Sequence, residues 1–236
     1  MTKNSPIHKI VGSVLVLVVL ALLGAIILDH HERRRAQHVA AQIKLLGIET
    51  TGIDATQIIQ GFGGRKVEFP SPKDRSVNLV LGISPCSDAD AVYAISSGPK
   101  YKLNRILAHF PGLDRLGLHP WDASASLFFK SQKLICFSET ARTWQPNGDA
   151  VFAQVYMIFS PLPTSDAKTY NVSSLRLRGN IYRLEVSVSS KSTVEERERA
   201  FTLDLRCVTT SAGCASPGEI MPLSWQRYLQ TRAATN

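Results

Sequence analysis

The sequence lacks the motifs that mark common hydrolases and nucleotide-binding enzymes. It contains no G-x-S-x-G nucleophile turn, no H-E-x-x-H metal site and no phosphate-binding P-loop. Its 27 Lys and Arg residues exceed its 19 Asp and Glu residues, for a net charge of +8. That excess is scattered, whereas nucleic-acid binding calls for basic residues clustered with aromatic ones. We therefore expect no nucleic-acid partner, and we expect no cofactor.

Cysteine is scarce, with four residues in the whole chain: Cys86, Cys136, Cys207 and Cys214. None of them stands in a C-x₂₋₄-C spacing, so the sequence gives no support for a zinc site. An even number of cysteines is typical of disulfides formed in an oxidising compartment. Cys207 and Cys214 flank a short loop rich in Thr, Ser and Gly, so we predict that they pair, and that Cys86 pairs with Cys136. The alternative is four reduced thiols in a cytosolic domain.

Charge is absent from Ile10 to Leu28, a run composed mainly of Val, Leu, Ile and Ala. As a helix this run spans roughly 28 Å, which is close to the thickness of the bilayer hydrocarbon core. A cleaved leader has a shorter apolar region followed by small residues, whereas this run ends in "IIL" and then "DHHERRR". The pattern predicts a transmembrane anchor that is retained. A cleaved leader and a buried globular helix are the alternatives.

The orientation of the anchor is predicted from the short N-terminal tail and the cysteines, because the flanking charges do not decide it. Lys3 and Lys9 precede it and Arg33, Arg34 and Arg35 follow it, so the positive-inside rule is nearly balanced. The first nine residues are too few for a domain, as in signal anchors whose long C-terminal part is exported, and the predicted disulfides agree with export. We predict a single-pass inner-membrane protein of bacterial type, with this layout: cytoplasmic tail 1–9, transmembrane anchor 10–28, juxtamembrane helix 29–47 and periplasmic domain 48–236.

Hydrophobic periodicity predicts an α+β fold, with a mainly antiparallel sheet and a few flanking helices. A helical stripe continues past the anchor through Ala36, Val39, Ala40, Ile43 and Leu46, so anchor and juxtamembrane helix would form one rod that lifts the domain off the bilayer. Strands are predicted at 75–84, at 125–139 as two strands about a "KSQK" turn, at 149–161, and at 180–190 and 200–208 as a long hairpin. Helices are predicted at 54–60, 101–112 and 221–233.

The arrangement resembles that of uncharacterised single-pass bacterial envelope proteins. The shared features are the N-terminal span, the Arg-rich juxtamembrane helix, a "GIDATQIIQGFGG" helix–glycine turn and a β-rich body that contains cysteine. The resemblance implies a place in the envelope and carries no activity with it.

Candidate chemistry is concentrated in the segment "AHFPGLDRLGLHPWD", residues 108–122. It contains the weak catalytic candidates His109, Asp114, His119 and Asp122, whose imidazoles and carboxylates are suited to metal binding or proton transfer.

Trp121 and Trp144 are weak candidates for contacts with a ligand or glycan. Our first hypothesis is a non-enzymatic, membrane-tethered domain that acts through protein–protein contact. The alternatives are an enzyme that uses the segment 108–122, and a ligand- or glycan-binding module.

Overall fold

The structure, a computed structural model, describes residues 6–48, 65–67, 89, 91–98, 118, 120–131, 133–144, 149–159, 170–177, 181–210 and 213–235. These residues form one long helix, a mixed sheet and several short helices, which confirms the predicted α+β fold class. The helices are α1 (Pro6–Ile48), α5 (Val194–Ala200), η4 (Cys207–Thr209), α6 (Pro217–Ile220) and α7 (Pro222–Thr235). The strands are β1 (Arg65–Val67), β2 (Ala91–Ser97), β3 (Trp121–Lys130), β4 (Lys133–Trp144), β5 (Ala150–Ile158), β6 (Tyr170–Leu177) and β7 (Ile181–Ser189).

The strands form one sheet in the order β1-β2-β3-β4-β5-β7-β6. Neighbouring strands are antiparallel except β5 and β7, which run parallel. The sheet is therefore mainly antiparallel, as predicted. The two strands predicted about the "KSQK" turn are β3 and β4, and the apolar strand predicted at 149–161 is β5. Helix α7 begins at Pro222, where a missing N–H costs nothing because the first turn has no acceptor for it.

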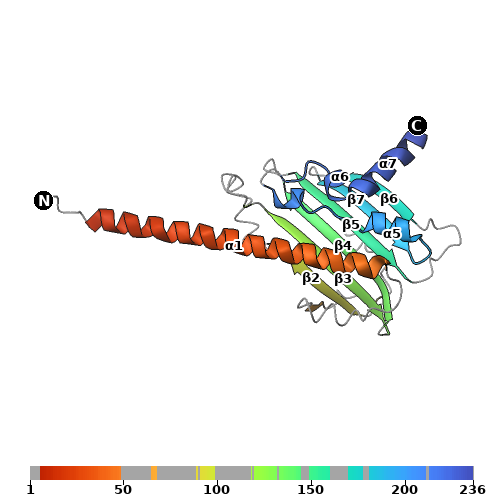
Figure 1. Ribbon diagram of the computed structural model, residues 1–236, viewed down its shortest axis with the longest axis horizontal. Coiled ribbons are helices and arrows are strands. Elements are labelled where there is room, and N and C mark those ends of the chain that lie inside the picture. The colour runs from red at the N-terminus through yellow and green to blue at the C-terminus, as the bar shows by residue number, and fades with distance from the viewer. Residues whose placement is uncertain are drawn as a thin grey trace.

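Helix α1 is a single helix of 43 residues with two different environments along its length. Its apolar part from Ile10 to Leu28 makes it long and apolar enough to cross a membrane, and the apolar window is not buried by the rest of the chain. In Figure 1 this part extends away from the sheet, and the C-terminal part of the helix lies across one face of the sheet. The predicted continuity of anchor and juxtamembrane helix is confirmed.

The second half of α1 is part of the hydrophobic core. Ala36, Val39 and Ile43 are buried and belong to the core cluster of the sheet, and Ala40 packs against it. The side chain of Leu46, also predicted in this stripe, lies outside the described part. Because this half of α1 lies across β2 and β3, it is a layer of the domain. The prediction that it forms a spacer is wrong.

Two faces of the sheet follow from strand alternation. On β3, the odd-numbered residues Trp121, Ala123, Ala125 and Leu127 belong to the core cluster that contains the α1 residues, so this face is called the helix face. Helices α5, α6 and α7 pack against the β5, β6 and β7 part of the fold. The even-numbered residues of β3, such as Asp122, point to the face opposite the helix face.

The predicted hairpin of 180–190 with 200–208 is wrong in its second strand. Residues 194–200, interpreted as a charged connection, form α5, and residues 201–206 run irregularly into η4. The partner of β7 is instead the upstream β6, in the register Leu177↔Ile181 to Tyr170↔Val188. Phe201 and Leu205 are buried in the core without strand pairing, which produced the misleading alternation. The elements predicted at 54–60, 75–84 and 101–112 lie outside the described residues.

Candidate functional site

The predicted disulfide between Cys207 and Cys214 is present, with the two Cα atoms 4.9 Å apart. Cys136 is also disulfide-bonded, and its predicted partner Cys86 lies outside the described residues. Glu219 lies close to the sulfurs of Cys207 and Cys214, but both sulfurs are consumed by their mutual bond. Metals bind the thiolate and not the disulfide, so this cluster is not suited to hold a metal ion. The disulfide instead links η4 covalently to the segment that leads to α6.

Of the four catalytic candidates, only Asp122 lies in the described part of the chain; His109, Asp114 and His119 lie outside it. Asp122 on β3 accepts hydrogen bonds through Oδ2 from Arg142 on β4, at 2.9 Å from Nε and 2.5 Å from Nη2. Burial raises the pKa of Asp122, and the neighbouring Arg142 opposes that shift. The carboxylate is thus engaged in a cross-strand ion pair.

Trp121 is not available as a surface contact, which corrects its place among the ligand-binding candidates. Its side chain is fully buried, and its indole Nε1 donates to Asp29 Oδ1 at 2.8 Å. Asp29 is the first residue after the apolar run, and it also pairs with Arg33 one turn later. A second contact lies close by, where the Gly98 N–H donates to Glu32 Oε2 at 3.3 Å. These bonds fasten the start of β3 and the end of β2 to α1.

Trp144 stays partly accessible at the end of β4. The guanidinium of Arg142 lies over its ring, 4.6 Å from the centroid. Arg142 therefore joins Asp122 and Trp144 into a small cluster on the face of the sheet opposite α1.

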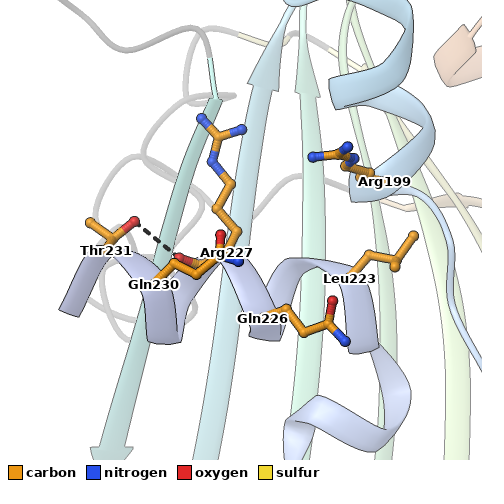
Figure 2. A pocket seen from close by; sticks show the side chains of 6 residues that line it. All are labelled: Arg199, Leu223, Gln226, Arg227, Gln230 and Thr231. Carbon is orange, nitrogen blue, oxygen red and sulfur yellow. Dashed lines mark hydrogen bonds between the residues drawn. The ribbon is translucent and has the colours of Figure 1, made fainter. Parts of the chain in front are cut away.

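A groove of about 570 Å³ lies between α5 and α7, at the opposite end of the molecule from the apolar part of α1 (Figures 1 and 2). Its lining is Arg199, Leu223, Gln226, Arg227, Gln230 and Thr231. Two guanidinium groups and two amides offer many N–H donors, whereas no lining residue carries a negative charge. The groove is suited to bind carboxylate or carbonyl groups.

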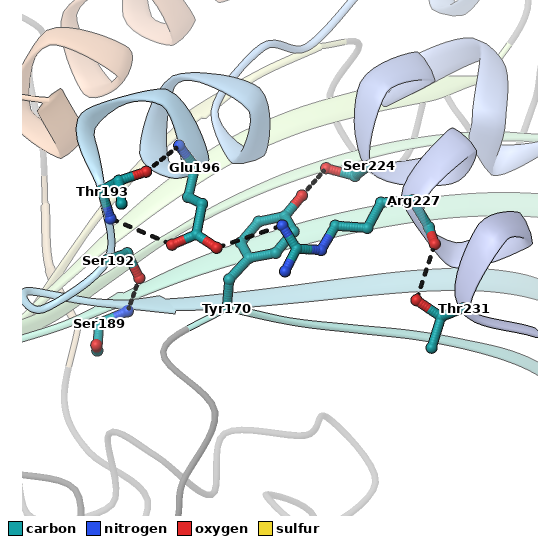
Figure 3. A network of polar contacts seen from close by, with 8 residues as sticks. All are labelled: Tyr170, Ser189, Ser192, Thr193, Glu196, Ser224, Arg227 and Thr231. Carbon is teal, nitrogen blue, oxygen red and sulfur yellow. Dashed lines mark hydrogen bonds and ion pairs between the residues drawn. The ribbon is translucent and has the colours of Figure 1, made fainter. Parts of the chain in front are cut away.

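Arg227 of α7 is held in the groove by neighbours on two other elements (Figure 3). Its Nη1 lies 3.3 Å from Glu196 Oε1 on α5, and its guanidinium lies 4.2 Å from the centroid of the Tyr170 ring on β6. The Tyr170 hydroxyl lies 3.0 Å from the buried Ser224 Oγ of α7. Burial raises the pKa of Tyr170, so it stays a neutral hydroxyl. This network fixes the distance between α5 and α7.

Glu196 has a second role as part of the N-terminal capping box of α5. The Glu196 N–H donates to Thr193 Oγ1, and the Thr193 N–H donates to Glu196 Oε2, both at 3.2 Å. Buried Arg197 supports the same turn by donating to the Ser192 carbonyl at 2.9 Å. The Thr193-x-x-Glu196 spacing is the sequence signal that predicts a helix start here, and the hypothesis of a charged connection overlooked it.

Replacing Glu196 with Ala removes the carboxylate that accepts the Thr193 N–H and pairs with Arg227, and it leaves the bond from the backbone N–H of residue 196 to Thr193 Oγ1 in place. We expect a loss of about 1–2 kcal/mol in the free energy of unfolding, measured by urea titration. Glu198→Ala on the same short helix is the matched control, because Glu198 is exposed and its pair with Lys44 at 3.7 Å lies in solvent; its expected loss is below about 0.5 kcal/mol. Equal losses in both variants would contradict the described role of Glu196.

Glu139 is an unusual residue that motif analysis missed. It lies on β4, on the helix face, opposite Ala125 of β3 and Val155 of β5. Its side chain is buried, Oε2 has no hydrogen-bond partner among the residues that the structure describes, and burial raises its pKa to about 8. No short sequence motif surrounds Glu139. The sequence signal for its burial is the two-residue alternation of β4, which puts Glu139 on the same face as the core residues Phe137 and Ala141.

No known protein family, no curated protein and no solved structure matches this chain.

Proposed function

We propose that this chain is a membrane-anchored domain of the cell envelope that acts by binding another protein. The observation that carries the proposal is the division of α1. Its residues from Ile10 to Leu28 are long and apolar enough to cross a bilayer and are not buried by the domain, whereas Ala36, Val39 and Ile43 are core residues. An exposed apolar helix of this length is stable in lipid and not in water.

The domain is placed outside the cytoplasm in this proposal because of its cysteines. The described cysteines Cys136, Cys207 and Cys214 are all in disulfides. Such bonds persist in oxidising compartments such as the bacterial periplasm and are rare in the cytosol. The short segment before α1 is then cytoplasmic, and the protein crosses the inner membrane once.

Protein binding is favoured by the position and chemistry of the groove between α5 and α7. Figure 1 shows α5 and α7 on the part of the domain remote from the N-terminal part of α1, so in an anchored molecule the groove lies away from the bilayer. Arg199 is exposed, and Arg227 is oriented by Glu196 and Tyr170. Arginine binds carboxylates through two parallel hydrogen bonds and is enriched among the residues that contribute most to protein interfaces.

Anchoring and compartment are tested together on membranes isolated from cells that express the chain. We expect the protein to stay in the pellet after alkaline carbonate extraction. We expect its cysteines to resist alkylation until a reductant is added. Protease added to spheroplasts should remove the domain. Release by carbonate would contradict the anchor, and alkylation without reductant would contradict the compartment.

Partner binding is tested with a photo-crosslinking residue at Gln226, which lines the groove and is exposed. Lys133, exposed at the start of β4, is the control position. We expect a discrete adduct of defined mass from position 226 in cells, absent from position 133 and weakened by Arg199→Glu. No adduct, or the same adduct from both positions, would contradict the groove as the binding site.

A further inference from the structure

We propose that Arg142 and Trp144 form a second contact with the membrane, in the layer of lipid headgroups. This inference rests on the proposed membrane anchor and extends it from a helix that crosses the bilayer to a domain that lies against it. The partner is the headgroup layer of the bilayer that holds α1.

The position of this cluster is fixed by a short chain of contacts that begins at the anchor. Asp29 follows Leu28 directly and accepts the hydrogen bond of the Trp121 indole at 2.8 Å. Pro120, next to Trp121, accepts the Trp144 backbone N–H at 3.2 Å. Trp144 therefore lies at the same end of the sheet as Trp121, which Asp29 holds against α1. The headgroup layer is about 5–7 Å thick on each side of the hydrocarbon core. Because Asp29 follows the membrane-spanning run directly, the end of the sheet that it holds lies at the depth of the headgroups.

One whole end of the sheet shares this location, and we call it the entry end. Strand register brings together the start of β3 at Trp121, the end of β4 at Trp144, and the starts of β5 at Ala150 and β7 at Ile181. Figure 1 shows α1 meeting the sheet where its second half begins. The entry end thus faces the bilayer, and the strands lead away from it.

The two contacts lie on opposite faces of the sheet. Trp121 belongs to the helix face, where α1 packs. Arg142 and Trp144 alternate with the helix-face residues Ala141 and Thr143, so their side chains project from the other face. With α1 as its one contact with the bilayer, the domain could rotate about the axis of that helix. A headgroup contact on the other face of the sheet would restrict this rotation and so fix the orientation of the domain on the membrane.

The side chains have the chemistry that this layer requires. Tryptophan is enriched at membrane interfaces because its ring is apolar and its N–H is polar. The side chain of Arg142 is 42% exposed and uses Nε and Nη2 to bind Asp122. Its Nη1 group has no hydrogen bond to the described part of the chain and is free to donate to a lipid phosphate. The charge of Asp122, the acidic residue that pairs with this cluster, is offset by Arg142.

The experiment uses the full chain in phosphatidylcholine–phosphatidylglycerol nanodiscs that carry a nitroxide on the headgroup, or near the end of the acyl chain. The chain has three tryptophans, so the emission of Trp144 is the difference between wild type and Trp144→Phe. We expect the headgroup nitroxide to quench that difference at least twofold more than the deep nitroxide. Trp225→Phe is the control: Trp225 adjoins Ser224, which contacts Tyr170 at the other end of the sheet, and its loss should leave the quenching amplitude unchanged.

Each outcome decides a different claim. Quenching of Trp144 by the headgroup nitroxide supports the second contact. A chain that co-floats with vesicles while its Trp144 emission is unquenched overturns this inference and leaves the anchor intact. A chain that fails to co-float overturns the anchor and this inference with it. Phe at position 144 keeps an aromatic side chain, and near-ultraviolet circular dichroism verifies that the variant is folded.

Discussion

A chain that begins at residue 29 is expected to be a folded, water-soluble domain, whereas a chain that begins at residue 49 is expected to be unfolded or aggregated. The first truncation removes the apolar part of α1, which the domain does not bury. The second also removes Ala36, Val39 and Ile43 from the core. Losing the burial of the Val and Ile side chains alone costs about 3–6 kcal/mol. Loss of the helix also exposes the β2 and β3 surface under it, and the total stability of a domain is only about 5–15 kcal/mol.

The truncations are compared by size-exclusion chromatography and by cooperative thermal unfolding. A point substitution provides the matched test within the longer chain. Ile43→Asp should abolish cooperative unfolding, because it buries an unpaired charge. Leu45→Asp should have little effect, because Leu45 is 45% exposed on the same helix. A soluble, cooperatively folded chain that begins at residue 49 would show that the second half of α1 is dispensable.

The stability of the domain is expected to fall as pH rises from about 4.5 to about 8, because of Glu139. Burial raises the pKa of Glu139 from 4.5 to about 8. In this window the folded state holds a proton that the unfolded state has released, so each step up in pH favours unfolding. Below the window both states are protonated and the penalty is absent; above it both are ionised and the penalty is constant. The full shift corresponds to an upper limit on the order of 5 kcal/mol.

Glu139→Gln should remove this slope, since an amide of similar shape does not titrate. We expect the variant to match wild type at about pH 5 and to exceed it by about 2 kcal/mol or more at about pH 9, in urea unfolding of the chain that begins at residue 29. Glu198→Gln on the exposed surface of α5 is the control and should retain the wild-type slope. Parallel pH profiles for wild type and Glu139→Gln would contradict the assignment.

The elements that sequence analysis predicted correctly are those with strong local signals. The apolar run and the stripe of Ala36, Val39 and Ile43 share one helical period, so α1 was predictable as a single helix. The two strands about the "KSQK" turn and the apolar strand β5 were also specified locally. What the periodicity could not show was which surface covers the stripe, because that depends on strands more than 40 residues away in the chain.

The errors came from competition between local patterns and tertiary partners. Phe201 and Leu205 alternate like strand residues, but they fill the core, where Phe201 packs on Phe137 of β4, and they pair with no strand in the described part of the chain. The Thr193–Glu196 cap was the stronger signal and would have corrected this interpretation. Trp121 gave no sign of burial, since its partner Asp29 lies 92 residues earlier.

The candidate site was less predictable than the fold. The groove between α5 and α7 depends on the packing of two short helices, and Arg227 becomes a defined feature only through Glu196 and Tyr170. Of the two tryptophans selected from sequence, burial removes Trp121 and leaves Trp144 accessible. Sequence supplied the candidate residue types, and only the packing distinguished a core residue from a surface one.

Hydrogen–deuterium exchange of the full chain in lipid nanodiscs tests most directly that one helix serves both bilayer and core. The account predicts slow exchange without interruption from Ile10 to Ile43, with residues 36–43 protected as strongly as the central strands β3, β4 and β5. Those residues should lose protection only when the sheet unfolds. Fast exchange of residues 29–43 beside a protected sheet would contradict it, because the second half of α1 would then be a loose tether and not a layer of the domain.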